Sequence, residues 1–178
     1  MAILTLAEYK LTPFYNAATQ TDANINYYLD IVDDLILFIR GIPFFTFEGD
    51  LTDTSTTIEI TNLYTYNWLY KGALLEGFND NIRGKITTWD ETETEITVDT
   101  AATGTNEDEL ITIYPKGSQN VAAEMIKYLI DNLSIDQTMK SESIGTYSYT
   151  RGDDYITVSG YSLPGYIANK IERFQSMK

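Results

Sequence analysis

The sequence contains no cysteine and no histidine. Without cysteine the chain can form neither a disulfide nor a thiol nucleophile, and without histidine it lacks the commonest general base. Zinc sites built from these two residue types are absent for the same reason. Composition therefore excludes most common catalytic and metal-binding arrangements, and we expect no cofactor. The lack of cysteine also fits a reducing compartment.

Long hydrophobic runs and positive charge are scarce as well. The longest apolar stretch, residues 35–47, is interrupted by Arg40, Gly41 and Pro43 and is too short to span a bilayer. No signal sequence opens the chain, so we expect a soluble, intracellular protein with no membrane partner. The net charge is −14 with only 12 Lys and Arg. Because neutralised phosphates supply most of the affinity for nucleic acid, a static DNA-binding surface is not expected.

Both ends of the chain have the hydrophobic spacing of amphipathic helices. Apolar residues recur at intervals of three and four over residues 25–40 and again over 118–133. A shorter helix is predicted at residues 5–10, where Thr5 is placed as the N-cap and Glu8 completes a capping box. Near the other end, the strand pattern of 154–160 precedes a last helix that Leu163 and Pro164 open.

The middle of the chain, residues 44–117, is a different kind of sequence. It holds 14 Asp and Glu against 4 Lys and Arg, whereas the two flanks together hold 12 against 8. It is rich in threonine, and turn-forming segments separate short runs of period-two alternation. These runs predict strands at 44–49, 56–61, 84–90, 94–99 and 109–115.

The predicted fold class is therefore α+β. A small helical domain, residues 1–43 and 118–178, is interrupted by an inserted antiparallel β-barrel or sandwich module, residues 44–117, and ends in a C-terminal strand and helix.

Carboxylates are the only abundant groups that could carry chemistry. Residues 90–95 (DETETE) and 106–109 (NEDE) could offer oxygen ligands to calcium, but neither has EF-hand spacing. We interpret both as solvated hairpin tips. A glycosidase needs only two carboxylates, one with a raised pKa, so one alternative stays open. In that alternative the protein is an acidic β-barrel that binds or cleaves carbohydrate, and its helices serve as a scaffold.

Tyrosine is abundant, with 14 residues, and it is dense in the C-terminal third. Tyrosine combines a large contact area with a polar tip and is enriched at protein interfaces. We therefore expect a contact surface there that includes Tyr147, Tyr149, Tyr155, Tyr161 and Tyr166.

Four segments in order resemble the head-to-tail connector, or adaptor, family of tailed bacteriophages. They are ILTLAEYK at residues 3–10, the first long helix with the aromatic strand after it, the third helix with the run SESIGTYS at 141–148, and LPGYIANKIERFQ at 163–175. Family members carry a similar Ser-Glu-Ser-Ile-Gly-x-x-Ser run followed by Leu-Pro and a last helix. The resemblance covers roughly the first 45 and last 60 residues, while compact members have a short loop or hairpin where this chain has about 74 residues.

The resemblance implies a structural virion protein without enzymatic activity. Members of this family form a ring, commonly of twelve subunits, that docks on the portal at the capsid vertex and completes the head. We therefore expect assembly in the bacterial cytoplasm, a final place in the neck of the virion, and contacts with itself, the portal and tail or neck proteins. Double-stranded DNA would pass through the ring without specific binding, which suits an acidic protein.

We predict one strand from Ser141 to Tyr149, which suits ring assembly because its backbone can pair with another chain. The candidate assembly or portal surface comprises Ser141, Glu142, Ser143, Ile144, Gly145, Tyr147, Ser148, Tyr149, Tyr155 and Tyr161. The last helix adds Leu163, Pro164, Ile167, Ile171 and Phe174.

Overall fold

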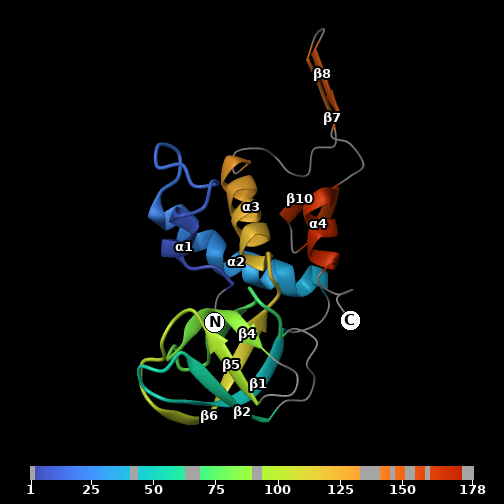
Figure 1. Cartoon of the computed structure of the whole chain (residues 1–178). Coiled ribbons are helices and arrows are strands. Elements are labelled where there is room, and N and C mark those ends of the chain that lie inside the picture. Colours follow the sequence, from blue (N-terminus) through green and yellow to red (C-terminus); the bar gives the residue numbers. More distant parts are fainter. Residues whose placement is uncertain are drawn as a thin grey trace. The chain divides into compact units, whose positions relative to one another are not determined.

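The computed structural model describes residues 3–40, 44–62, 69–89, 94–132, 141–144, 147–150, 155–158 and 161–173 (Figure 1). The chain forms two compact units. The barrel unit is Pro43–Ser118, and the helical unit is Ala2–Ile42 together with Gln119–Ser176. The barrel unit begins one residue before and ends one residue after the predicted module of 44–117.

The barrel unit is a closed, six-stranded antiparallel barrel, and it confirms the predicted α+β fold with an inserted β module. Around the barrel the strands follow the order β1-β2-β5-β4-β3-β6. Their bounds are β1 Phe45–Leu51, β2 Thr57–Asn62, β3 Leu74–Gly77, β4 Arg83–Trp89, β5 Glu95–Val98 and β6 Asn106–Tyr114. Closure leaves no unpaired strand edge in the sheet, which removes the usual site of edge-to-edge aggregation.

Every second side chain along most of the strands is buried, and these side chains fill the barrel interior. Apolar residues from every strand and from the loops form one core: Phe47, Leu51, Ile58, Leu69, Ala73, Leu75, Ile82, Ile86, Ile96, Val98, Ala102, Ile111 and Ile113. The first and last strands are neighbours, since Phe45 of β1 pairs with Ile113 of β6. The chain therefore enters and leaves the barrel side by side, which is what an insertion into another domain requires.

The period-two pattern found five of the six strands and missed β3. All four residues of β3 are buried, so its sequence LLEG has no alternation to detect. Glu76 breaks the apolar run but is itself only 5% exposed.

Gly49 is required by a close approach inside the barrel. The pairing of β1 with β2 shifts between Glu48 and Gly49. A Cβ on Gly49 would lie 2.9 Å from Cγ2 of Ile58 and 3.0 Å from the carbonyl oxygen of Glu59. Only glycine fits this bulge without moving the neighbouring strand.

The described residues of the helical unit form four helices: α1 Leu6–Lys10, α2 Asp22–Arg40, α3 Ser118–Asp131 and α4 Gly165–Glu172. The capping box at Thr5 and Glu8 is confirmed, since each side chain bonds the backbone N–H of the other residue. Spacing of three and four is confirmed in α2, where Ile25, Tyr28, Val32, Leu35 and Ile36 are buried. None of the helices in the described ranges has the length and hydrophobicity needed to cross a membrane.

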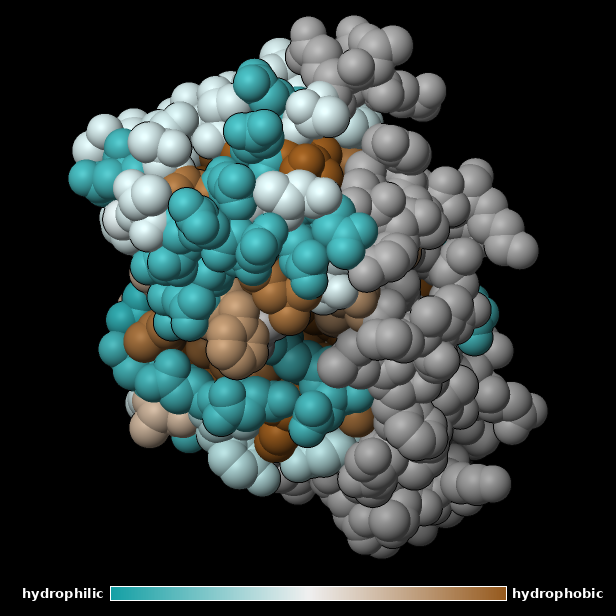
Figure 2. Space-filling model, turned by 90° about the horizontal axis from the view of Figure 1, so that it is seen from below, coloured by the Kyte–Doolittle hydropathy of each residue, from teal (hydrophilic) through white to brown (hydrophobic). Residues whose placement is uncertain are grey.

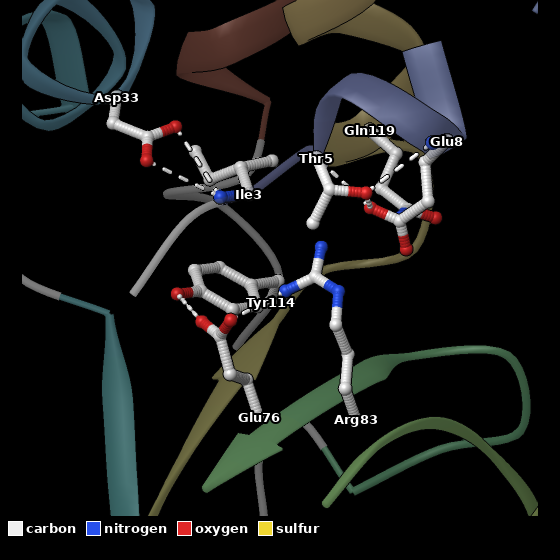
Figure 3. A network of polar contacts seen from close by, with 8 residues as sticks. All are labelled: Ile3, Thr5, Glu8, Asp33, Glu76, Arg83, Tyr114 and Gln119. Atoms are coloured by element: carbon white, nitrogen blue, oxygen red, sulfur yellow. Dashed lines mark hydrogen bonds and ion pairs between the residues drawn. The ribbon is translucent and has the colours of Figure 1, made fainter. Parts of the chain in front are cut away.

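Polar contacts hold the N-terminal segment against two helices of this unit (Figure 3). Asp33 of α2 accepts hydrogen bonds from the backbone N–H of Ile3. Gln119 of α3 donates to Oε1 of Glu8, and the other oxygen of Glu8 accepts from Thr5. The capping carboxylate therefore joins α1 to α3 as well as capping α1.

Four short strands lie between α3 and α4 in the sequence. They are β7 Ser141–Ile144, β8 Tyr147–Thr150, β9 Tyr155–Val158 and β10 Tyr161–Pro164. They form two separate two-stranded sheets, β7 with β8 and β9 with β10.

Candidate assembly surface

The run that resembles the connector family forms a hairpin. The sequence predicted one strand from Ser141 to Tyr149, whereas the structure has two antiparallel strands. Ile144 pairs with Tyr147, and Ser141 pairs with Thr150 at the open end. The pairs between them are Glu142 with Tyr149 and Ser143 with Ser148. Gly145 lies outside the described residues.

The β7–β8 hairpin has no further strand beside it in the part of the chain that the structure describes. A two-stranded hairpin alone in water is marginally stable at best, and a third strand or a packed helix is needed to secure it. The hairpin therefore has two strand edges that another chain could pair with.

The β9–β10 sheet belongs to the core of the helical unit. Tyr155 of β9 pairs with Pro164, and Val158 pairs with Tyr161. This sheet contacts α2 and α4. Leu163 of β10 is fully buried.

The described apolar residues assigned to the last helix and to the strand before it lie in the core of the helical unit. Leu163, Ile167 and Ile171 are each 0% exposed, and Pro164 is also buried as the N-cap residue of α4. These side chains are core and are not available to a partner in the folded unit. Phe174 lies outside the described residues. Tyr166, by contrast, is 52% exposed.

Tyr161 lies beside a tyrosine that the sequence interpretation missed. The hydroxyl oxygens of Tyr161 and Tyr27 are 3.5 Å apart, and Tyr27 is 59% exposed. The ring of Tyr27 also meets the ring of Tyr28 edge-on, with centroids 5.0 Å apart. The hydrogen bond with Tyr27, followed by burial, raises the pKa of Tyr161 to about 12. The signal in the sequence was that Tyr27 stands next to the apolar stripe of α2 without belonging to it.

A shallow pocket of about 350 Å³ opens on the helical unit. Its lining combines Pro13 and Phe14 with residues of α3 and α4. Nζ of Lys170 lies 2.6 Å from a carboxylate oxygen of Glu124 in this lining and 5.3 Å from the centroid of the Tyr166 ring. The ion pair neutralises the charged groups of the pocket, so its lining offers no net charge to a ligand.

The acidic segment 106–109 was interpreted as a solvated hairpin tip, and for Glu109 this is wrong. Glu109 lies in β6 and is only 3% exposed. Its carboxylate accepts hydrogen bonds of 2.8 Å from the backbone and side-chain nitrogens of Asn79 and from the side chain of Asn106. Burial alone would raise the pKa of Glu109, but these hydrogen bonds outweigh it and lower the pKa. The carboxylate is a structural clamp on the turn after β3.

A second buried carboxylate in the barrel is also held by donors (Figure 3). Glu76 lies 2.7 Å from a guanidinium nitrogen of Arg83, and it accepts a hydrogen bond of 2.8 Å from the hydroxyl of Tyr114. The barrel therefore pairs this buried carboxylate with donors from β4 and β6.

The remaining described carboxylates do not gather into a metal site. No group of three or more possible ligands occurs among the residues that the structure describes. Part of the segment 90–95 falls outside those residues. On the face drawn in Figure 2, hydrophilic residues cover most of the described surface, and hydrophobic residues form small separate areas between them.

The sequence matches no protein-family model and no curated protein.

Proposed function

We propose that the chain is a structural component of the head-to-tail connector of a tailed bacteriophage. In this proposal identical copies close into a ring, of twelve subunits in the connectors it resembles, that docks on the portal and forms part of the DNA channel. The ring has no enzymatic activity, binds no cofactor, and meets tail or neck proteins on its other side. This is the adaptor position in the neck of the virion.

One observation carries the proposal. The run Ser141–Ser148, which is the most specific part of the resemblance, coincides with a hairpin that has no third strand in the described structure. A ring subunit needs surfaces that another copy completes, because a head-to-tail contact must repeat until the ring closes. An unaccompanied hairpin between α3 and α4 is such a surface.

The charge of the chain supports the same proposal. A net charge of −14 repels phosphates, which suits a channel through which DNA must slide without being held.

The buried carboxylates favour this function over carbohydrate cleavage. A glycosidase needs a general acid whose pKa is raised so that it keeps its proton. In Glu109 the pKa is lowered instead, since donors from Asn79 and Asn106 favour the ionised form. Glu76, the other buried carboxylate discussed above, has its two oxygens bonded by Arg83 and Tyr114.

The proposal is tested by the mass of the assembled protein. Native mass spectrometry and negative-stain imaging of the full chain, alone and mixed with the portal of the same virus, are expected to show a large closed oligomer. A chain that stays monomeric with and without portal would refute the proposal. A monomer that also binds oligosaccharides would favour the carbohydrate alternative.

A further inference from the structure

We propose that the outer edge of β8 in one copy pairs antiparallel with the outer edge of β9 in a neighbouring copy. The result is a four-stranded sheet, in the order β7-β8-β9-β10, that crosses the boundary between two subunits. The inference rests on the proposed function, because it names the contact that closes the ring.

The register of the first hairpin determines which backbone N–H and C=O groups of β7 and β8 point away from the other strand of the hairpin. Only two residues separate Ile144 from Tyr147, and the residues that flank a two-residue turn form a hydrogen-bonded pair. Hydrogen-bonded and non-bonded pairs alternate along an antiparallel ladder. The N–H and C=O groups of β8 that point away from β7 therefore belong to Ser148 and Thr150, and those of β7 that point away from β8 belong to Ser141 and Ser143.

The register of the second sheet determines in the same way which backbone groups of β9 point away from β10, and Pro164 provides a second argument for it. Two residues separate Val158 from Tyr161, so this pair is hydrogen-bonded and Tyr155 with Pro164 is not. Proline has no N–H to donate, which agrees with its place in a non-bonded pair. On β9 the backbone groups that point away from β10 therefore belong to Tyr155 and Thr157.

Each of the two sheets has one face with Ser and Thr positions and one face without them. Directly paired residues share a face, so the positions of Ser141, Ser143, Ser148 and Thr150 make one face of the first hairpin entirely Ser and Thr. The opposite face has the positions of Glu142, Ile144, Tyr147 and Tyr149. In the second sheet one face has Ile156, Val158, Tyr161 and Leu163, and the other has Tyr155, Thr157, Ser162 and Pro164.

Antiparallel pairing of β8 with β9 therefore brings like faces together. Opposed residues in an antiparallel ladder both point their backbone groups at the partner strand or both away from it. Thr157 would then face Ser148 or Thr150, so the Ser and Thr face continues the face of Thr157. The face of Ile144 and Tyr147 continues the face of Leu163. Parallel pairing would join opposite faces, because opposed residues then alternate in backbone direction.

The residue types favour pairing at the outer edges of β8 and β9 over pairing at the outer edges of β7 and β10. The outer edge of β10 contains Pro164, which cannot donate a hydrogen bond and is a usual guard against pairing. On the first hairpin, β7 carries the charged residue Glu142, whereas β8 is Tyr147–Thr150, made of strong strand formers and serine. The strands β8 and β9 contain neither a proline nor a charged residue.

The partner is a second copy because each chain keeps the two sheets apart. In the described structure β8 and β9 belong to different sheets, so each chain has both halves of the joint and has joined neither. A head-to-tail contact of this kind between identical chains closes into a ring when its rotation allows.

Engineered cysteines test the pairing directly, since the chain has no cysteine of its own. We expect Ser148→Cys or Thr150→Cys, combined with Thr157→Cys, to give a ladder of disulfide-linked multimers, because opposed Cα atoms lie about 5.5 Å apart. Tyr149→Cys with Thr157→Cys is the matched control and should give no ladder, as these positions fall on opposite faces. An equal mixture of the Ser148→Cys and Thr157→Cys chains should give a linked dimer.

Proline substitutions distinguish the outer edge of β8, which we propose to pair with a neighbouring copy, from the outer edge of β7, which we do not. Ser148→Pro removes a donor that points at the neighbouring copy, so we expect association to weaken roughly tenfold or more. Ser143→Pro removes an equivalent donor from the guarded edge of β7, and ring formation should survive it. Circular dichroism at 222 nm should be unchanged in both variants.

The outcomes distinguish a failure of the proposed β8–β9 contact from a failure of the proposed connector function. Rings of normal mass without any disulfide ladder, or a disulfide formed only within one chain, would overturn the inference and leave the connector proposal standing. Rings that tolerate Ser148→Pro as well as Ser143→Pro would overturn it too. A protein that forms no closed oligomer with portal would refute the proposed function itself.

Discussion

Replacing Glu109 by glutamine should destabilise the barrel by about 2–3 kcal/mol at pH 7. The carboxylate accepts three hydrogen bonds of 2.8 Å from Asn79 and Asn106, and it is 3% exposed. Hydrogen bonds to a charged group contribute about 1.5–3 kcal/mol, against about 0.5–1.5 kcal/mol for neutral pairs. Glutamine also turns an NH₂ group toward an amide donor, which leaves one buried donor unpaired.

The pH dependence of this effect follows from the direction of the pKa shift. The folded protein holds the pKa of Glu109 below the ordinary value of 4.5. The carboxylate therefore contributes stability that is present above pH 4.5 and is lost as the pH falls through the lowered pKa. The stability difference between the parent protein and Glu109→Gln should shrink between pH 7 and about pH 3.

Tryptophan fluorescence during urea unfolding measures this stability difference, because Trp89 lies in β4 of the barrel. Glu107→Gln is the matched control, since Glu107 is exposed on the same strand and should change stability by less than about 0.5 kcal/mol. An unchanged unfolding midpoint in Glu109→Gln would refute the reasoning. A stability loss that is the same at pH 7 and pH 3 would refute the part that concerns charge.

Three further predictions address the two units. Gly49→Ala should lower barrel stability by about 1–3 kcal/mol, because its Cβ would press on Ile58 and the backbone of Glu59; an unchanged urea midpoint would contradict the close approach. Replacing residues 44–117 by a short Gly/Ser linker should leave the helical signal at 222 nm intact, since the barrel's first and last strands are neighbours and loop closure costs little; loss of that signal would show that the barrel is part of one core. Burial raises the pKa of Tyr9 to about 12, so the parent should lose stability as the pH rises from 10 toward 12, and Tyr9→Phe should lose less over the same range in thermal melts.

Local sequence was enough to predict the helices. The spacing of three and four and the Thr5–Glu8 capping box involve residues within one or two turns of each other, so a short window contains all the information. The same holds for five strands of the barrel, whose alternation reflects one buried and one exposed face. It fails for β3, where both faces are covered and the alternation disappears.

The prediction of a connector rests on sequence alone, mainly on the run at 141–148, whereas the hairpin that this run forms came from the structure. A continuous alternating run predicts one strand as readily as two, and only the pairing of Ile144 with Tyr147 shows where the chain turns back. The register then decides which backbone groups point away from the partner strand, and neither composition nor spacing reveals this.

Tertiary structure alone decided the roles of the acidic and aromatic residues. Glu109 sits in a hydrophilic run, yet Asn79, thirty residues earlier, supplies the donors that keep it buried and ionised. Tyr161 meets Tyr27 across 134 residues of sequence. Sequence determines which faces are apolar, because that depends on neighbours along the chain. Which polar groups find partners depends on segments brought together only when the barrel closes and the helices pack.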